Sequence, residues 1–330
     1  NSRRGCLFAN KLNMRKIFLI TDRNLTLSDS IARYTIDLAE GLSRQNFGVT
    51  IFSTEEAKRK DYILQNGVKY VSGLPKVSEN AIFHFQFTFS QRLHTKFFLK
   101  NLEKLKNKSI VTLHVTPEYA EIMDQKREME TILKGLSYAN TPILTFSNYA
   151  KYDLKRFMIS NCHVVYPGLN LDRYKKFLRD STKKEKQILV VASNPEKSFV
   201  QKVKGFNFLE IIKNKYKNFK IKEVINLSFD DYLREMAKSQ FYIALSGVEH
   251  YGLAIIDAYN LLAIPIYTNE GGLTEAVYGK GITITIKEEI VLPDTLSYNM
   301  QIARENYTFS VRQHPIEKHV KNIISLYETI

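Results

Sequence analysis

The sequence predicts a chain of two α/β domains, each built on a parallel sheet that helices cover on both faces. Short apolar runs alternate with amphipathic helical stretches, which is the pattern of repeated strand–helix–strand units. The alternation stops in a polar, lysine-rich stretch at residues 167–186 and then starts again. With 330 residues, 44% of them hydrophobic, the chain is long enough for two cores of ordinary size.

The first expected domain spans residues 14–166. Residues 17–20 are its first strand, and apolar residues at helical spacing within 28–44 predict the helix that follows. Further strands are expected at 49–52, 82–87, 109–113 and 143–146. Residues 1–13 show no period and precede Met14, so we interpret them as a vector-derived or upstream extension.

The second expected domain spans residues 167–330 and repeats the same pattern. Its strands are expected at 187–192, 221–225, 241–244 and 264–267, and its helices at 206–215, 230–238 and 253–262. The stretch 317–327 predicts a final helix, which can pack back on the first domain.

Composition and charge restrict the class of protein. No apolar run reaches the roughly 18 residues of a membrane-spanning helix. Cys6 and Cys162 define neither a disulfide framework nor a metal site, so a reducing cytoplasm is expected. The formal charge is +14, and residues 1–165 hold 25 of the 48 Lys and Arg but only 15 of the 34 Asp and Glu. A basic surface attracts anionic lipid, nucleic acid or phosphorylated substrates, and charge alone does not separate these from an ordinary solvated surface.

The strongest functional signal lies between a strand and the helix expected at 253–262. Glu249 and Asp257 stand eight positions apart, so one precedes the helix and the other lies about two turns into it. Gly252 allows a ligand to approach the backbone closely, and the helix start offers N–H groups to an anion. Carboxylates in this position suit sugar hydroxyls, although an ordinary helix start with a surface glutamate would look the same.

A second loop strengthens this signal. Gly271 and Gly272 follow the strand at 264–267, and two glycines between a strand and a helix form a turn that can hold phosphate or sugar. A plain connecting turn is the alternative. The two loops at this spacing favour one ligand site.

Together these loops resemble the retaining GT-B glycosyltransferases, specifically glycosyltransferase family four. The family signature has a glutamate, seven residues and a second glutamate, in a segment close to Ser-x-x-Glu-Gly-Phe-Gly-Leu. Here His250, Tyr251 and Asp257 replace the Gly, the Phe and the second Glu. The resemblance implies a GT-B fold, in which two Rossmann-like domains face each other across a cleft. It also implies a UDP- or GDP-linked sugar as substrate, no cofactor and no metal.

The resemblance assigns roles residue by residue. Glu249 would contact the donor sugar and Asp257 the ribose, while Lys204 matches a lysine that neutralises the leaving diphosphate. Asn194 stands where the family has an arginine, and His114 matches a histidine beside the donor sugar. The implied catalytic residues are Glu249, His114 and Lys204, and the implied donor-binding residues are Asp257, Asn194, His250, Tyr251, Gly252, Leu253, Gly271, Gly272 and Leu273.

The first domain matches the family less closely. The family's glycine pair after the first strand is absent, and Ser28, Asp29 and Ser30 stand there instead as the expected acceptor or phosphate loop. His84, which is expected at the end of a strand, is predicted to contribute to the same acceptor or phosphate site.

A basic segment suggests a membrane surface as a partner. Residues 92–108 carry six basic residues and one acid, with an apolar stripe of Phe97, Phe98, Leu99, Leu102 and Leu105. Such a segment can lie on an anionic membrane and present a lipid-linked acceptor. Equally, the stripe can pack in the core with the lysines in water. The expected location is the cytoplasm, with or without attachment to the inner face of the membrane.

The sequence therefore predicts a retaining hexosyltransferase for polysaccharide, glycolipid or glycoprotein synthesis, with a sugar, lipid-linked or protein acceptor. One alternative is a nucleotide-sugar-binding subunit with weak or no catalysis, which Asn194 permits. Others are a glycosyltransferase acting on modified nucleic acid, and a phosphorylase or hydrolase of the same architecture. Nucleic acid is the weaker interpretation, because no zinc spacing, RNA-binding aromatic motif or helix-turn-helix signature is found.

Overall fold

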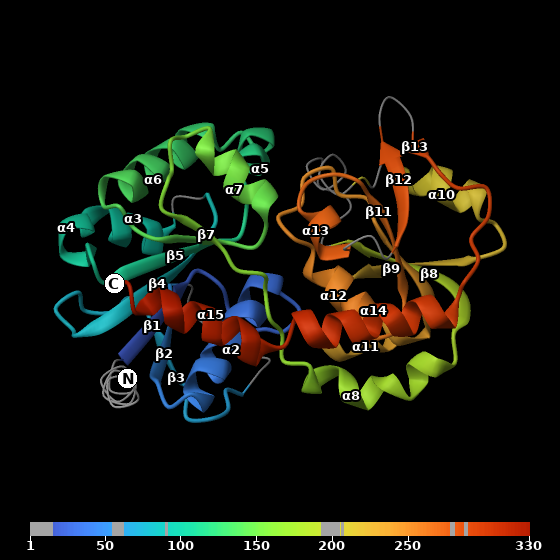
Figure 1. Ribbon diagram of the computed structural model, residues 1–330, viewed down its shortest axis with the longest axis horizontal. Helices are drawn as coiled ribbons and strands as arrows, with labels where there is room; N and C mark the ends of the chain where they lie inside the picture. Colours follow the sequence, from blue (N-terminus) through green and yellow to red (C-terminus); the bar gives the residue numbers. More distant parts are fainter. Residues whose placement is uncertain are drawn as a thin grey trace, which may run out of the picture. The chain divides into compact units, whose positions relative to one another are not determined.

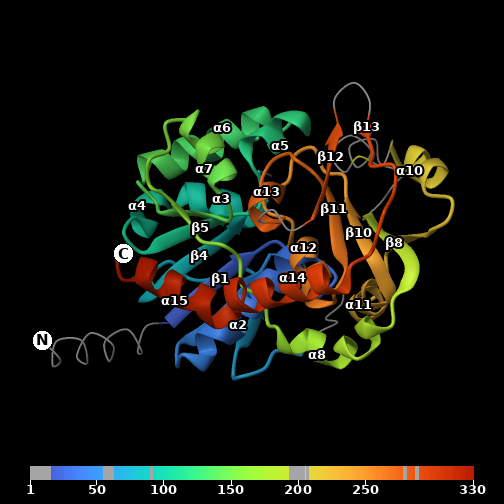
Figure 2. The same ribbon diagram turned by 45° about the vertical axis from the view of Figure 1, so that its right-hand side comes forward.

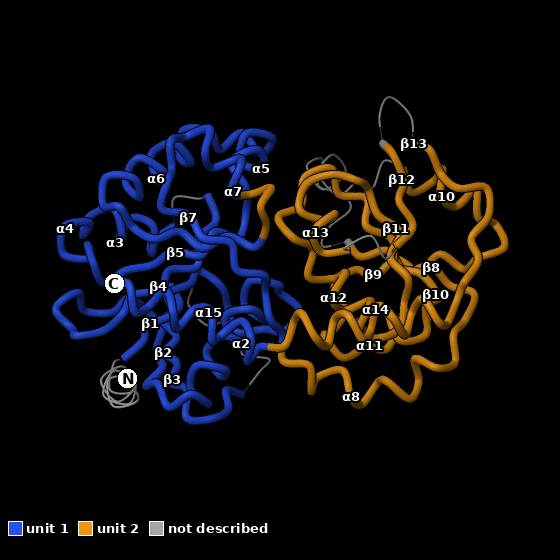
Figure 3. The backbone as a smooth tube through the Cα atoms, in the orientation of Figure 1, with its two compact units in different colours: residues 1–146, 151–169, 316–330 blue, residues 147–150, 170–315 orange. Residues whose placement is uncertain are grey.

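The computed structural model describes residues 16–54, 63–89, 92–192, 205, 208–277, 281–286 and 290–330. The chain forms two compact units (Figures 1 and 3). The first holds the described residues up to Phe146 together with 151–169 and 316–330, and the second holds 147–150 and 170–315. The final segment of the chain thus belongs to the first unit. The expected extension at residues 1–13 lies outside the described residues.

The first unit is built on a seven-stranded parallel sheet in the order β3-β2-β1-β4-β5-β6-β7. The chain winds outward from β1 to β3 and then crosses to β4, so the strand order reverses between β1 and β4. The strands are β1 (Lys16–Thr21), β2 (Gly48–Ser53), β3 (Lys69–Ser72), β4 (Ala81–Phe87), β5 (Ser109–Leu113), β6 (Ile143–Thr145) and β7 (Cys162–Val164).

Helices cover both faces of this sheet (Figures 1 and 2). One face carries α2 (Ser30–Arg44) and the last helix, α15 (Ile316–Tyr327). The other carries α3 (Leu93–Lys100), α4 (Leu102–Leu105), α5 (Pro117–Ile122), α6 (Lys126–Tyr138) and α7 (Asn148–Lys155). Because helices cover both faces, the central strands β1, β4 and β5 are almost entirely buried and are rich in apolar residues.

The apolar stripe of residues 92–108 lies in this core and does not form an exposed membrane-binding face. Phe98 and Leu105 are fully buried, and Phe97, Leu99 and Leu102 pack against the same cluster of apolar side chains. Burial in the core is favoured because it removes this apolar surface from water. Of the two interpretations of this stripe, packing in the core is confirmed for these five side chains, and insertion into a membrane is not supported. The exposed side chains of the segment include four lysines, Lys96, Lys100, Lys104 and Lys106.

A chain of buried hydrogen bonds holds α15 to the first sheet. His319 Nδ1 lies 2.8 Å from the carbonyl oxygen of Tyr166, and its Nε2 lies 2.8 Å from the Tyr34 hydroxyl. Because a carbonyl only accepts, Nδ1 of His319 carries a proton. His84 Nε2 lies 2.6 Å from Thr112 Oγ1.

His84 occupies the middle of β4, and the expectation that it ends a strand is wrong. Its side chain is fully buried, and Nδ1 lies 2.7 Å from the Tyr327 hydroxyl oxygen. Burial, reinforced by the nearby His319, lowers the pKa of His84 to about 3. Both ring nitrogens are bonded inside the unit, so this histidine fastens α15 to β4 and β5.

The second unit is built on a six-stranded sheet in the order β13-β12-β11-β10-β8-β9. The pairs are parallel except for β12 with β13, and the strand order reverses between β8 and β10. The strands are β8 (Glu185–Ala192), β9 (Lys220–Ile225), β10 (Ser239–Ala244), β11 (Ile264–Thr268), β12 (Ile282–Ile286) and β13 (Ile290–Val291). The helices are α8 (Asp172–Leu178), α10 (Leu209–Lys215), α11 (Phe229–Lys238), α12 (Leu253–Asn260), α13 (Leu273–Val277) and α14 (Met300–Gln313).

In the described part of the chain, no helix is long and apolar enough to cross a membrane.

We predict that the protein loses stability as the pH falls from about 6.5 toward 4. The pKa of His84 is about 3 in the folded protein and about 6.5 in the unfolded chain. The unfolded state therefore binds a proton that the folded state does not, and the free energy of unfolding falls by about 1.4 kcal/mol per pH unit. Urea unfolding at several pH values should show this slope reduced by about that amount in His84→Gln. Equal slopes in the two proteins would contradict the prediction.

Candidate functional site

The loops predicted to bind the donor meet at the carboxyl edge of the second sheet. The loop that carries Glu249 follows β10, the glycine pair Gly271–Gly272 follows β11, and Gly205 lies in the connection after β8. These three strands are neighbours, and the strand order reverses between β8 and β10. Doubly wound sheets bind their ligands at such a reversal point. The structure thus brings the sequence-predicted loops together.

Direct packing of backbone on backbone fixes the Glu249 loop against the glycine pair. The amide of Gly272 donates to the carbonyl oxygen of Glu249 at 2.7 Å. A Cβ atom on Gly272 would lie 2.0 Å from the carbonyl oxygen of His250. A Cβ on Gly271, which has φ 59°, would lie 2.7 Å from the carbonyl oxygen of Glu249. Only glycine fits at either position.

Two more glycines complete this packing. Gly252 adopts φ 86° at the start of α12, and a Cβ there would lie 2.7 Å from the Leu273 side chain. Gly205 adopts φ 66°, and its Cβ would lie 2.4 Å from the carbonyl oxygen of Leu245, where the Glu249 loop begins. The chain after β8 therefore returns to the same loop. Lys204, the neighbour of Gly205, and Asn194 lie outside the described residues.

The predicted donor residues divide by their exposure. Glu249, Gly252, Leu253 and Gly271 are half-buried, whereas His250, Tyr251, Gly272 and Leu273 are buried. The Tyr251 hydroxyl lies 3.5 Å from His314 Nε2, inside the unit. The side chains of the buried group therefore support the loop, and the half-buried group forms its accessible part.

Asp257 lies on the buried side of α12. Its carboxylate accepts from the Tyr174 hydroxyl of α8 at 2.5 Å on one oxygen and from the Tyr232 hydroxyl of α11 at 2.8 Å on the other. The residue is 1% exposed. Both tyrosines were missed in the sequence, because nothing in their local pattern marks them as partners of a residue on another helix. Ribose contact by Asp257 stays a prediction.

His114 lies directly after β5 in the first unit, as its position in the sequence predicts. Its Nε2 lies 2.8 Å from Gln86 Oε1, so with the amide oxygen as acceptor Nε2 carries the proton. The ring packs edge-on against Tyr34 and Phe146, with centroids 5.2 and 5.5 Å away. These contacts fix the orientation of a half-buried imidazole at the carboxyl edge of the first sheet.

The serine–aspartate loop before α2 does not offer an anion site. Asp29 caps the helix, and its Oδ1 accepts from the amides of Ile31 and Ala32 at 2.9 and 2.8 Å. Ser28 pairs with Thr26 through their hydroxyl oxygens, 2.8 Å apart, and Ser30 opens the helix. A carboxylate already occupies the amides that a phosphate would need. The geometry therefore does not support the predicted phosphate contact at Ser28–Ser30.

A charged cluster that the sequence did not single out lies at the corresponding edge of the first sheet. Asp22 and Arg23 follow β1 directly, while Arg92 and His94 stand at the start of α3. The position of Asp22 and Arg23 immediately after a predicted strand was the one signal available. Their meeting with residues seventy positions later depends on the pairing of β1 with β4.

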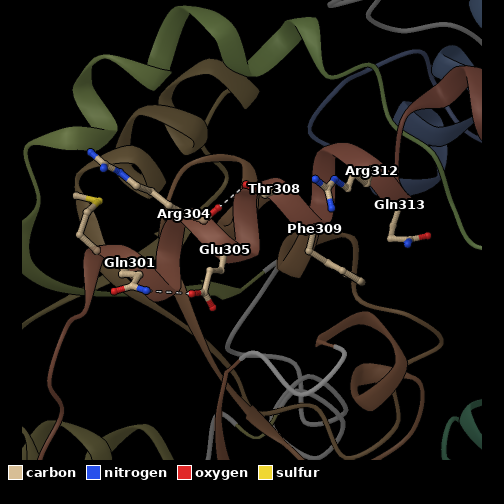
Figure 4. A pocket seen from close by; sticks show the side chains of 8 residues that line it. Gln301, Arg304, Glu305, Thr308, Phe309, Arg312 and Gln313 are labelled. Carbon is tan, nitrogen blue, oxygen red and sulfur yellow. Dashed lines mark hydrogen bonds between the residues drawn. The ribbon is translucent and has the colours of Figure 1, made fainter.

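A hollow of about 800 Å³ runs along α14 in the second unit (Figure 4). Its lining comes from one helix and includes Gln301, Arg304, Thr308 and Arg312. None of the predicted donor residues contributes to it, so it is distinct from the Glu249 loop. Among the described residues, no group of three or more His, Cys, Asp or Glu is arranged to hold a metal ion.

No protein-family model matches the chain, and no curated protein matches its sequence. Solved structures do match over nearly its whole length. Anabaena HepE, solved with UDP and glucose, superposes with a TM-score of 0.66 at 11% identity and covers 96% of this chain and 100% of its own. The fold is that of the GT-B glycosyltransferases.

Two further GT-B structures support this. Sucrose-phosphate synthase from Thermosynechococcus elongatus matches with a TM-score of 0.67 at 12% identity, covering 95% of this chain and 98% of its own. An alpha-glucosyltransferase, solved with UDP-glucose and DNA containing an abasic site, matches with a TM-score of 0.59 at 11% identity, covering 95% and 99%. At these identities the likeness shows the fold.

We expect Gly272→Ala to destabilise the second unit. Its new Cβ would lie 2.0 Å from a backbone oxygen, and relieving such overpacking typically costs about 1–3 kcal/mol. Gly247→Ala is the matched control, because a Cβ there meets nothing within 4 Å, and its effect should stay within about 0.5 kcal/mol. Urea unfolding of both variants measures the difference. Equal stability would contradict the backbone packing described for the loop.

We also expect Tyr174→Phe to lower stability. The buried Asp257 carboxylate loses one of its two tyrosine donors, and an unsatisfied buried acceptor costs about 1–3 kcal/mol. Tyr152→Phe removes a hydroxyl from a side chain that is 65% exposed and should have little effect. If thermal unfolding places the two variants at the same midpoint, the hydroxyl of Tyr174 does not support Asp257.

Proposed function

We propose that the chain is a retaining glycosyltransferase that moves a sugar from a nucleoside-diphosphate sugar to an acceptor hydroxyl. The observation that carries this proposal is the Glu249 loop, seated on Gly271–Gly272 at the reversal point of the second sheet. The GT-B fold supports it. HepE, of the same fold, was solved with UDP and glucose, which supports a UDP-linked sugar as the donor.

The start of α12 is the part of the site suited to a diphosphate. Gly252 caps this helix without a side chain, so no carboxylate or hydroxyl of the cap competes for the first amides of the helix. The opposite holds at α2, where Asp29 takes these amides. An uncapped helix start attracts negative charge through its N–H groups and its dipole. We therefore assign the diphosphate to Gly252–Leu253 and the adjacent Gly271.

Transfer breaks the bond between the anomeric carbon and the diphosphate oxygen, and the electron pair leaves with the diphosphate. Charge grows on the leaving group in the transition state, so fixed N–H donors stabilise it more than the ground state. The acceptor oxygen bonds to the anomeric carbon from the face that the diphosphate leaves, and its proton passes to a diphosphate oxygen. Lys204 is proposed as the cation beside this group, on the strength of the family resemblance.

Glu249 and Asp257 take different parts in this proposal. The half-buried Glu249 carboxylate accepts hydrogen bonds from the hydroxyls of the donor sugar. Each carboxylate oxygen of Asp257 already accepts from a tyrosine, so its contribution to ribose binding would come through the position of α12. His114 is proposed, again by resemblance, as a sugar-binding imidazole.

Glu249→Gln should bind nucleotide and lose turnover. UDP should raise the melting temperature of wild type and variant alike, because ligand that binds the folded state stabilises it. Transfer from UDP-glucose, or its hydrolysis, should fall by about two orders of magnitude in the variant, the size of effect seen when one transition-state contact is removed. Glu210→Gln, an exposed glutamate of α10, should behave as wild type.

The outcomes separate the two main candidates. A panel of UDP, GDP, UDP-glucose and GDP-mannose that leaves the melting temperature unchanged would overturn the donor site. Stabilisation by a nucleotide without turnover of any sugar nucleotide would instead support a binding subunit, the candidate favoured by Asn194 in the place of the family arginine.

Transfer to modified nucleic acid is a further candidate. Two observations favour it: the formal charge of +14, and the matching alpha-glucosyltransferase that was solved with DNA. A gel-shift assay with duplex DNA at about 0.15 M salt tests it, since phosphate contacts weaken steeply with salt. Absence of a shift rejects this acceptor and leaves the donor site untouched.

A further inference from the structure

The last helix of the chain, α15, lies directly on α2 in the first unit (Figures 1 and 2). The two helices meet at Gly41, where a Cβ atom would lie 2.7 Å from Val320 Cγ2 and 2.9 Å from Ile316 Cγ1. These two residues belong to one buried face of α15, whose members stand three or four positions apart. The face consists of Ile316, His319, Val320 and Ile323. The missing side chain at Gly41 therefore allows α15 to pack closely on α2.

Tyr34 of α2 is bonded to this face of α15. It stands two turns before Gly41, so the two residues lie on the same side of α2. Its side chain is fully buried. The hydroxyl oxygen lies 2.8 Å from His319 Nε2, and the two rings meet edge-on with centroids 5.3 Å apart. His319 is fixed in turn, because its Nδ1 donates to the carbonyl oxygen of Tyr166 at 2.8 Å.

The same tyrosine ring contacts His114, the proposed sugar-binding imidazole. The two rings meet edge-on, with centroids 5.2 Å apart. Phe146 packs edge-on against both of them, at 4.9 Å from Tyr34 and 5.5 Å from His114. On the sheet, Gln86 Oε1 lies 2.8 Å from His114 Nε2. Two aromatic rings and one hydrogen bond thus hold the imidazole, and one of these rings is the ring that is bonded to α15.

The Tyr34 ring is held at both ends. Its Cβ belongs to the backbone of α2, and its hydroxyl is bonded to His319 of α15 and to Thr112 of β5. Edge-on contacts between rings have a preferred geometry, so a displacement of the Tyr34 ring changes the orientation that the His114 ring prefers. Close-packed interiors transmit such displacements because they contain few voids. A change in the seating of α15 therefore reaches the imidazole.

Burial separates the residue that can contact a ligand from those that support it. His114 is half-buried and directly follows β5 at the carboxyl edge of the sheet, which is the edge where such sheets bind ligands. Tyr34 and His319 are buried and do not reach a ligand themselves. Their effect on a ligand passes through the orientation of His114.

We propose that Tyr34 is a positioning residue for His114, through which α15 sets the orientation of the imidazole. The final helix of the chain thereby contributes to sugar binding without contacting the sugar. The contribution to sugar binding rests on the proposed function, whereas the orientation of the ring does not.

NMR spectra of the full chain with isotope-labelled histidine test the orientation. The sequence has seven histidines, and the imidazole signals that disappear in His114→Gln are those of His114. Tyr34→Phe keeps the ring and removes the hydroxyl. It should shift the His114 signals, because the chemical shifts of an imidazole depend on the orientation of the aromatic rings beside it.

Tyr216→Phe is the matched control for the loss of a buried hydroxyl. The Tyr216 hydroxyl donates to the carbonyl oxygen of Pro293 at 2.8 Å in the second unit, so its removal costs a comparable hydrogen bond. The His114 signals should stay in place in this variant. The proposal is overturned if Tyr34→Phe leaves these signals where Tyr216→Phe leaves them.

His319 provides a second test and a rescue. His319→Leu removes both hydrogen bonds of the side chain and should shift the His114 signals in the manner of Tyr34→Phe. His319→Gln has an amide that both donates and accepts, so its spectrum should lie closer to that of wild type. A role in apolar packing alone predicts the reverse order, because leucine fills a buried site without a polar group. That reverse order would also overturn the proposal.

Turnover separates this proposal from the proposed function. With UDP-glucose as substrate, Tyr34→Phe should lower kcat about tenfold with little change in KM, since misplacing a reacting group slows the reaction. The shift in melting temperature with UDP should stay unchanged, because Tyr34 lies outside the donor loops. Shifted His114 signals with unchanged kcat would overturn the part of Tyr34 in sugar binding. A wild-type chain that no nucleotide stabilises would contradict the proposed function alone, and the NMR comparison would still decide the link from α15 to His114.

Discussion

The contact between the Glu249 loop and the glycine pair is the constraint on which the candidate donor site depends. Here two backbones touch, with the Gly272 amide on the Glu249 carbonyl and no space for a Cβ atom. A contact of this kind has little freedom to adjust, because neither partner is a flexible side chain. It sets the position of Glu249 and of the first turn of α12 together. Gly205 adds the connection after β8 to the same packing.

The helices α12 and α2 both begin at the carboxyl edge of a sheet, but they differ in how their first backbone amides are capped. At α12, Gly252 in the left-handed conformation begins the helix, and no side chain caps its first amides. At α2, the Asp29 carboxylate caps the helix. The nearby positive charge belongs to Arg23 and Arg92, which form ion pairs with the buried Asp22 carboxylate. An uncapped helix start favours an anion such as a diphosphate, whereas at α2 the Asp29 carboxylate already accepts from the first amides.

Buried polar side chains connect elements that are distant in the sequence. Asp257 joins α12 to α8 and α11 through two tyrosine hydroxyls. In the first unit, two histidines fasten the last helix: His84 bonds Tyr327 and Thr112, and His319 bonds Tyr34 and the carbonyl oxygen of Tyr166. Such networks are stable when every member is satisfied. Asp22 differs from them, because its two oxygens lie 3.4 Å from Nε of Arg23 and of Arg92 in ion pairs.

The sequence by itself determined the alternation of strands and helices, the Glu249 loop and the glycine pair after the next strand. These are local properties: periodicity within one segment and the backbone freedom of glycine. It missed β3, β7, β12, β13, α8 and α14, whose patterns are less regular. Of these, α8 lies within the polar stretch 167–186, where no element was expected. Residues 92–108 show what the sequence alone cannot decide. The same apolar stripe could contact a membrane or pack in the core, and only the packing of Phe98 and Leu105 in the structure distinguishes the two.

Only the tertiary structure decided which polar residues meet. Asp22 and His94 are brought together by the pairing of β1 with β4, and Asp257 reaches Tyr174 because two helices pack side by side. No spacing along the chain encodes such meetings. They arise when parallel strands align their carboxyl ends and when helices bury their faces. The sequence therefore determined where the loops of the candidate donor site begin, and folding decided which side chains support them.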